Sequence, residues 1–420
     1  MSDDASLNRR LWLFVALVVS VTVWIASPAR EDLYLSIGSV NVFFNDLIVL
    51  AALAMGGREL LRTAGAPERS LARLLSRLVI GYLAYELLLV IPVALWIGKA
   101  TLPSIIRAMG TRFYWILFPA LLPLFRDARM RRKASKVVLV AAAGLAVWGV
   151  YLALTGSGGL GFYADQGESG RFRILGALAP PLFCWPLAAA ASGVAASGVS
   201  LGLGVLAVIG QTITGFRSGL IAFGTAGLAG LVGSRRLSKV AVWLLPAALV
   251  GIVGYLLWSS TASAVYGYTL EHLLDFGSTN AVDRFTRWGL AWQFFQANPF
   301  NDFVWSWHRY LVNLASGYEP HNFVLEIATT EGVAGLAFYG TVIAAAARTI
   351  WSTFRGDAEA RAIACFLIAY LLFSGLNANW YAYSSMPLFI AGVAALAALS
   401  ERRSAPEGIP TPGGPDSPAA

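Results

Sequence analysis

The chain has 420 residues, of which 57% are hydrophobic and only 13% charged, and its formal net charge is +8. A soluble domain carries about 25% charged residues, so this composition excludes a water-soluble globular protein. The mean hydropathy of +0.65 instead predicts that lipid surrounds most of the chain. In lipid, each crossing helix takes about 20 apolar residues.

Apolar runs long enough to cross a bilayer recur along the whole chain. They lie near 11–27, 34–55, 78–97, 113–125, 137–155, 174–194, 198–216, 218–233, 240–258, 322–347, 362–376 and 381–399. Because only helices and closed barrels can span lipid, we predict an all-α polytopic integral membrane protein with about twelve transmembrane helices.

The lengths of the intervening segments predict four parts. Residues 1–258 hold transmembrane helices one to nine with short loops, and 259–320 form a large outer loop between helices nine and ten. Residues 321–400 hold helices ten to twelve, and 401–420, rich in Pro, Gly and Ser, form a disordered tail. A loop as long as 259–320 is far beyond an ordinary connection, which indicates a function.

Lysine and arginine residues set the orientation of these helices. With the N-terminus inside, 21 of the 31 basic residues fall in cytoplasmic segments. This bias satisfies the positive-inside rule, so the positive charge reflects topology and no nucleic-acid partner is predicted.

Arginines every four residues in 69–77 also predict an amphipathic helix on the anionic lipids of the inner leaflet. The first run could be a cleaved signal peptide, but Pro28 and the long apolar core favour a retained anchor.

The longest polar and aromatic stretch runs from Asn280 to Gly332 and contains two of the three histidines. Within it, WGLAWQFFQANPF (288–300) has apolar residues at helical spacing. We predict a helix here that lies along the outer interface and ends at Asn298-Pro299.

Three arginines are candidates for binding an anionic substrate. Arg217 lies between two apolar runs at the outer boundary, where an arginine is costly and usually has a partner or a role. Arg284 and Arg287 are three residues apart, so on a helix their guanidinium forks share one face and suit a diphosphate. The alternatives are a snorkelling arginine at 217 and a solvated or headgroup-binding face at 284–287.

His321 follows Pro320 and precedes the run 322–347, which places it at a helix start on the outer rim. A neutral imidazole there could take a proton from a hydroxyl. The alternative is a hydrogen-bonded structural histidine. Asn322 and the nearby Glu326 are candidates for orienting His321 or the substrate, whereas Glu331 is better explained as half of a structural ion pair.

No zinc spacing, P-loop or paired acidic motif occurs in the sequence. Both cysteines, Cys184 and Cys365, fall inside apolar runs, which argues against a disulfide framework. We therefore predict a reaction that needs neither a metal nor another cofactor.

Three motifs carry a resemblance to a known family. HNFVLEIATTEGVAGL (321–336) resembles the HN-x-x-LE…G…G signature of the O-antigen ligase and O-antigen polymerase superfamily. RFTRWGLAWQFFQANP (284–299) resembles its R-x-x-x-W…NP segment, and TGFRSGL (214–220) resembles its small-x-R-small motif. One departure is that the segment after Pro299 lacks the G-x-G that many members carry.

The resemblance implies a GT-C-like fold and a bacterial inner membrane location, with the active site on the periplasmic side and both termini cytoplasmic. It implies that Arg217 and Arg284 hold the diphosphate of an undecaprenyl-linked glycan donor. His321 would activate an acceptor hydroxyl, on a lipid A-core sugar or another glycan, for an inverting and metal-independent transfer.

Two alternatives to an O-antigen ligase stay open. A polymerase of the same superfamily would join repeat units or make exopolysaccharide, and the motifs do not separate it from a ligase. A transporter of lipid-linked glycans would more often show ionisable residues near the midplane and broken helices in repeated halves. The clustering of polar residues at the outer rim favours the enzyme.

Overall fold

The structure is a computed structural model of the whole chain. It describes residues 3–26, 34–37, 40–66, 70–98, 113–155, 180–192, 194, 219, 221–222, 224–226, 279–300, 320, 322–354, 357–376 and 386–404.

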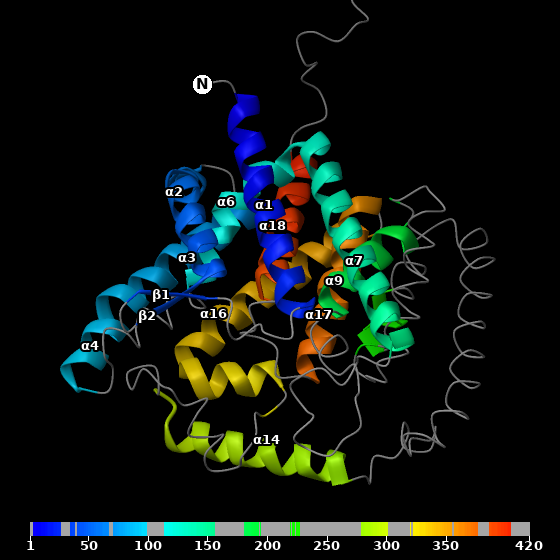
Figure 1. Cartoon of the computed structure of the whole chain (residues 1–420). Coiled ribbons are helices and arrows are strands. Elements are labelled where there is room, and N and C mark those ends of the chain that lie inside the picture. The colour runs from blue at the N-terminus through cyan, green and yellow to red at the C-terminus, as the bar shows by residue number, and fades with distance from the viewer. Residues whose placement is uncertain are drawn as a thin grey trace, which may run out of the picture.

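Helices dominate the described residues (Figure 1). The elements are α1 (Asp3–Ala26), β1 (Tyr34–Ile37), β2 (Val40–Phe43), α2 (Phe44–Gly65), α3 (Leu71–Tyr85), η2 (Glu86–Val90), α4 (Ile91–Trp96), η3 (Phe113–Ile116), α6 (Leu117–Arg126), α7 (Ala128–Thr155), α9 (Pro180–Ala191), α14 (Thr279–Ala297), α16 (Phe323–Thr353), α17 (Ala358–Gly375) and α18 (Met386–Ser404).

Four of the described helical segments are long and apolar enough to cross a membrane. They are Asp4–Ala26, Leu71–Trp96, Phe323–Thr353 and Ala358–Gly375. By length and composition, then, the protein is helical and embedded in a membrane. The predicted runs 198–216 and 240–258 lie outside the described residues, as do most of 218–233, most of the loop 259–320 and the tail beyond Ser404.

The predicted run 34–55 differs from the structure at its start. Residues 34–43 form a two-stranded antiparallel hairpin in which Tyr34 pairs with Phe43 and Ile37 with Val40. Only then does α2 begin, at Phe44. The expectation of one continuous helix over 34–55 was therefore wrong.

The basic segment 69–77 also differs from its prediction as a helix lying on the membrane surface. Its described part begins the candidate span Leu71–Trp96 instead. Ser70 caps α3, and Leu71, Leu75 and Val79 are buried in the core. Further along the same span, η2 is a π-helical turn in which Ile91 N–H donates to Glu86 O. Pro92 explains this turn, because it lacks the N–H that a regular helix would supply.

Close approach of α2 and α6 depends on Gly56. A Cβ at this position would lie 3.0 Å from the backbone nitrogen of Ala120 and 3.1 Å from the carbonyl oxygen of Ile116. Small residues at such contacts let membrane helices approach closely and gain van der Waals packing. Backbone atoms of α6 cannot rotate away as a flexible side chain would.

Replacing Gly56 with alanine is expected to destabilise the protein by about 1–3 kcal/mol, because the added methyl group overpacks the contact with α6. Gly57→Ala is the matched control, since a Cβ there meets nothing within 4 Å. It should be neutral or stabilising by up to about 1 kcal/mol. The thermal unfolding midpoints of the two purified variants in one detergent measure the difference. Equal midpoints would contradict the packing argument.

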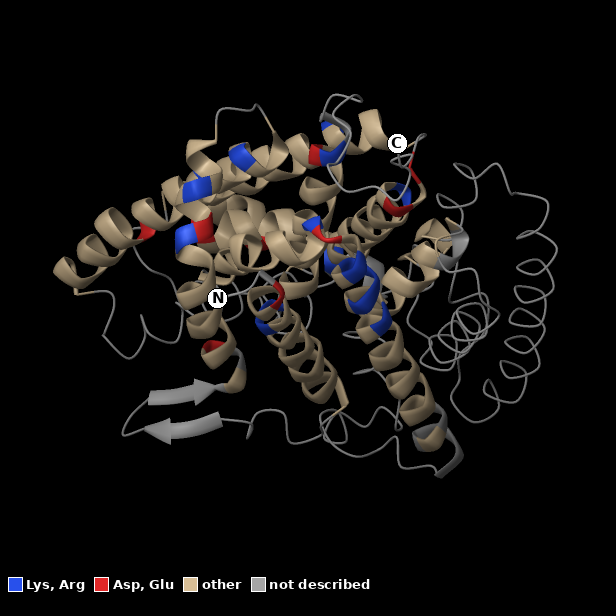
Figure 2. Ribbon diagram, turned by 90° about the horizontal axis from the view of Figure 1, so that it is seen from above, with Lys and Arg blue, Asp and Glu red and all other residues tan. Residues whose placement is uncertain are grey.

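Charged side chains join several helices at one end of the bundle, the end at which α1 starts and α18 stops (Figure 1). Arg126 at the end of α6 binds Glu59 of α2 at 2.6 Å and Glu401 of α18 at 2.8 Å. Arg131 of α7 binds Glu359 at the start of α17 at 2.7 Å. Figure 2 looks onto this end and shows basic and acidic positions interspersed. We refer to it as the charged end.

Candidate functional site

Helix α14 lies crosswise over the end of the bundle opposite the charged end (Figure 1). It contacts α16, and its Arg284 reaches Leu376, which caps the last turn of α17. Since α17 has 18 residues and starts at the charged end, the two ends lie about 27 Å apart. The helix predicted in 288–300 is present as part of α14, which ends at Ala297, just before Asn298-Pro299.

One face of α14 turns toward the bundle. Arg287 and Ala291, one turn apart, are buried, while Phe285 and Trp292 are exposed. This pattern is the amphipathic arrangement of a helix that packs on one side and meets lipid or water on the other. Arg284, three residues before Arg287, is partly buried, so the two arginines turn to the packed side.

Two hydrogen bonds join α14 and the residues just after it to α16, one immediately before α16 begins and one at the break in α16. The indole Nε1 of Trp288 donates to the carbonyl oxygen of Pro320 at 2.6 Å. The backbone N–H of Val333 donates to the carbonyl oxygen of Pro299 at 2.9 Å. Because one bond lies on each side of the first segment of α16, α14 and this segment form one layer across the bundle end.

Residues from two separate motifs converge on the last turn of α17. Arg284 Nη1 donates to the carbonyl oxygen of Leu376 at 3.3 Å, and Asn322 Nδ2 donates to that of Gly375 at 3.2 Å. The last carbonyls of a helix lack donors within the helix, so side chains commonly satisfy them. Two adjacent carbonyls thus bring Arg284 and Asn322 together, although 38 positions separate them in the sequence.

Asn322 also begins α16. Its Oδ1 accepts from the backbone N–H groups of Val324 at 3.0 Å and Leu325 at 3.2 Å, which is an N-cap. Glu326 in the first turn is 2% exposed, and Arg287 on α14 is 8% exposed. The site is therefore assembled from polar side chains that are fixed by caps and burial.

Helix α16 is broken at Gly332, where φ is 59° and ψ is −151°. Only glycine occupies this conformation without strain. The break interrupts the helix between Glu331 and Val333, which lets Val333 N–H bond to Pro299 instead of to its own helix. The residues from Phe323 to Glu331 consequently form a short segment that packs with α14 rather than continuing the axis of the span (Figure 1).

Gly332→Ala is expected to cost about 1–3 kcal/mol through backbone strain. Because the strain is relieved by straightening α16, the variant should also loosen α14. Gly340→Ala in the same helix is the matched control, since a Cβ there meets nothing within 4 Å. Thermal unfolding together with limited proteolysis near Pro299 measures both effects. If Gly332→Ala behaves like Gly340→Ala, the break does not require glycine.

Arg217 and His321 lie outside the described residues, as do His308 and Arg309. The chain neighbours of His321 are described: Pro320, bonded to Trp288, and Asn322, the N-cap of α16. Among the residues that the structure describes, no group of three or more His, Cys, Asp or Glu side chains is arranged to hold a metal.

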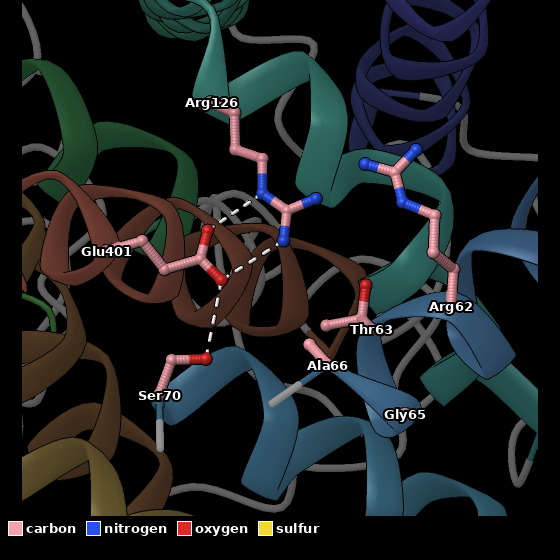
Figure 3. A pocket seen from close by; sticks show the side chains of 7 residues that line it. All are labelled: Arg62, Thr63, Gly65, Ala66, Ser70, Arg126 and Glu401. Atoms are coloured by element: carbon pink, nitrogen blue, oxygen red, sulfur yellow. Dashed lines mark hydrogen bonds and ion pairs between the residues drawn. The ribbon is translucent and has the colours of Figure 1, made fainter. Parts of the chain in front are cut away.

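A cavity of about 530 Å³ lies at the charged end, far from α14. Its walls include Arg62, Thr63, Ser70, Arg126 and Glu401 (Figure 3). Arg126 Nε and Nη2 donate to the two oxygens of Glu401 at 2.8 and 3.0 Å, and Nη1 donates to Glu59. The carboxylates therefore bind all three nitrogens of this guanidinium. The cluster is an ion-pair network that links α2, α6 and α18.

The structure adds two residues for which the sequence patterns suggested no role, Trp288 and Glu86, and it gives Glu331, which was expected in an ion pair, a hydrogen bond to a tyrosine. Trp288 was expected only as an apolar residue of the interface helix, but its indole N–H anchors α14. Glu331 accepts a hydrogen bond from Tyr82 of α3 at 2.8 Å. Glu86 is 1% exposed within a candidate span. A glutamate inside an apolar run was the available signal for Glu86, because buried carboxylates in spans are rare and functional by default.

No protein-family model matches the chain, and no curated protein shows significant similarity to it.

Proposed function

We propose that the protein is an O-antigen ligase-like glycosyltransferase. It moves a glycan from undecaprenyl diphosphate to a sugar hydroxyl, with lipid A-core as the acceptor, at the bundle end covered by α14. The fuller architecture that goes with this proposal has about twelve spans in a GT-C-like arrangement, in a bacterial inner membrane with α14 on the periplasmic side.

The convergence of Arg284 and Asn322 on the last turn of α17 is the observation that supports the proposal most. These residues belong to the two motifs whose resemblance suggested the transferase. A guanidinium has five N–H donors in a fixed plane, so the bond to Leu376 holds the orientation of the Arg284 fork. Arg287 lies on the same packed side of α14. A cationic pair beside the N-terminus of α16 favours a diphosphate.

The chemistry needs one base and charge stabilisation. The acceptor oxygen attacks the anomeric carbon, the bond from that carbon to the phosphate oxygen breaks, and undecaprenyl diphosphate leaves with the electron pair. His321 takes the proton of the acceptor hydroxyl. Arg217, Arg284 and Arg287 stabilise the negative charge that grows on the diphosphate. Asn322 and Glu326 orient the sugar and the base.

Reconstitution tests the proposal. The purified protein is placed in liposomes with an undecaprenyl-diphosphate glycan, and the products are sized with lipid A-core present or absent. We expect one glycan to be added to each core. A ladder of glycan lengths formed without core would instead identify a polymerase, and movement of the intact donor across the bilayer without product would identify a transporter. Both of these results would contradict the ligase.

A further inference from the structure

The carboxylate of Glu331 is buried inside the protein and has a hydrogen-bond donor there. Glu331 is 1% exposed and lies in the candidate span Phe323–Thr353. A buried carboxylate is costly unless it is hydrogen-bonded. The hydroxyl of Tyr82 donates to its Oε2 at 2.8 Å, and Tyr82 comes from a helix 249 positions earlier in the chain. The contact therefore joins α3 to α16 through two buried groups.

Gly335 provides the space for this carboxylate. A Cβ at position 335 would lie 2.9 Å from Glu331 Oε2 and would overlap the Cβ of Glu331. The overlap arises because the break at Gly332 turns residue 331 back over the following turn. The sequence E-G-x-x-G at 331–335 thus acts as one unit. Gly332 permits the break in the helix, and Gly335 leaves space for the side chain of Glu331.

The donor of the hydrogen bond is held rigidly. The ring of Tyr82 stacks on that of Phe338 with centroids 4.3 Å apart and an angle of 15° between planes. Trp115 packs edge-on against Phe338, with centroids 5.1 Å apart. All three side chains are buried. Aromatic packing of this kind fixes the direction of the Tyr82 hydroxyl.

We propose that the Tyr82–Glu331 hydrogen bond is a positioning contact that holds the first segment of α16, from Asn322 to Glu331, against α14. Glu331 is the last residue before the break, so a tether there sets the direction of the segment that carries Asn322 and Glu326. The bond from Val333 to Pro299 holds the other side of the break. The consequence for catalysis rests on the proposed function, whereas the effect on the segment does not.

Hydrogen–deuterium exchange of the full-length protein in nanodiscs tests the tether. Tyr82→Phe removes the donor, Glu331→Leu removes the acceptor, and Glu331→Gln keeps a carbonyl acceptor. We expect exchange in peptides covering 322–332 to rise about tenfold in Tyr82→Phe and Glu331→Leu, and to stay near the wild-type rate in Glu331→Gln. Peptides covering 336–353 should not change. No rise in Tyr82→Phe, or an equal rise along the whole of α16, would overturn the proposal.

A glycine pair provides a second test that leaves the polar groups in place. Gly335→Ala pushes the Glu331 side chain out of its position, whereas Gly340→Ala meets open space in the same helix. We expect Gly335→Ala to reproduce the exchange pattern of Tyr82→Phe and Gly340→Ala to match the wild type. Identical patterns in the two alanine variants would overturn the role of the 331–335 unit.

The transfer assay then connects the tether to catalysis. Tyr82→Phe and Gly335→Ala should lower kcat for glycan transfer about tenfold with little change in KM for the donor, and Glu331→Gln should retain most of the rate. Altered exchange with an unchanged kcat would overturn the positioning role. If the wild-type protein transfers no glycan, the proposed function fails, and the exchange experiment still decides whether the tether exists.

Discussion

His321→Ala should lower the rate of glycan transfer by about 10²–10⁴-fold while donor affinity stays within about threefold. The physical reason is that alanine cannot accept the proton of the attacking hydroxyl, whereas the charges that bind the diphosphate are left in place. Initial transfer rates and equilibrium binding of the undecaprenyl-diphosphate glycan, measured on the same preparations, check the two halves of this expectation.

His308→Ala is the matched control, because it removes the other imidazole of the stretch Asn280 to Gly332. Its transfer rate should equal that of the wild type. A His321→Ala variant that transfers at the wild-type rate would remove the base from the mechanism. A variant that loses rate and donor affinity together would show that the residue is structural.

Arg284→Ala should lower kcat/KM for the donor by about 10²–10³-fold, and Arg284→Lys by about 10–100-fold. Lysine keeps the positive charge but cannot present two parallel N–H donors to a phosphate. The two substitutions therefore separate the contribution of the charge from that of the fork. Kinetics over a range of donor concentrations gives both values.

The control must exclude damage to the bundle end, because Arg284 also bonds to Leu376. Loss of one such bond costs about 1 kcal/mol, so the thermal midpoint of Arg284→Lys should stay close to that of the wild type. Arg348→Ala, at an exposed position of α16, controls for the removal of any arginine. Wild-type kinetics in Arg284→Ala would refute the diphosphate clamp.

Local sequence patterns predicted the elements with strong periodicity. The helix in 288–300 follows from apolar spacing, and the start of α16 follows from Pro320 and the apolar run after it. The N-cap role of Asn322 was not predicted. Hydropathy alone missed the hairpin at 34–43, because an apolar run does not reveal whether it is strand or helix.

The breaks in the spans were harder to predict. Gly332 could have been an ordinary small residue of a membrane helix, and only the backbone angles show that it interrupts α16. Likewise, Pro92 predicts a disturbed helix but not the π turn that accommodates it. Such details depend on which neighbouring groups satisfy the freed backbone atoms.

The amino-acid sequence by itself determined that this protein is helical and embedded in a membrane, and which residue types α14 and the start of α16 carry. These properties depend on composition and on the spacing of a few residues. The tertiary structure alone decided which distant groups meet. Arg284 and Asn322 share the end of α17, and Glu331 takes its hydrogen bond from Tyr82. These contacts follow from how whole helices pack, and no local pattern encodes which helix end or which hydroxyl will face a given side chain.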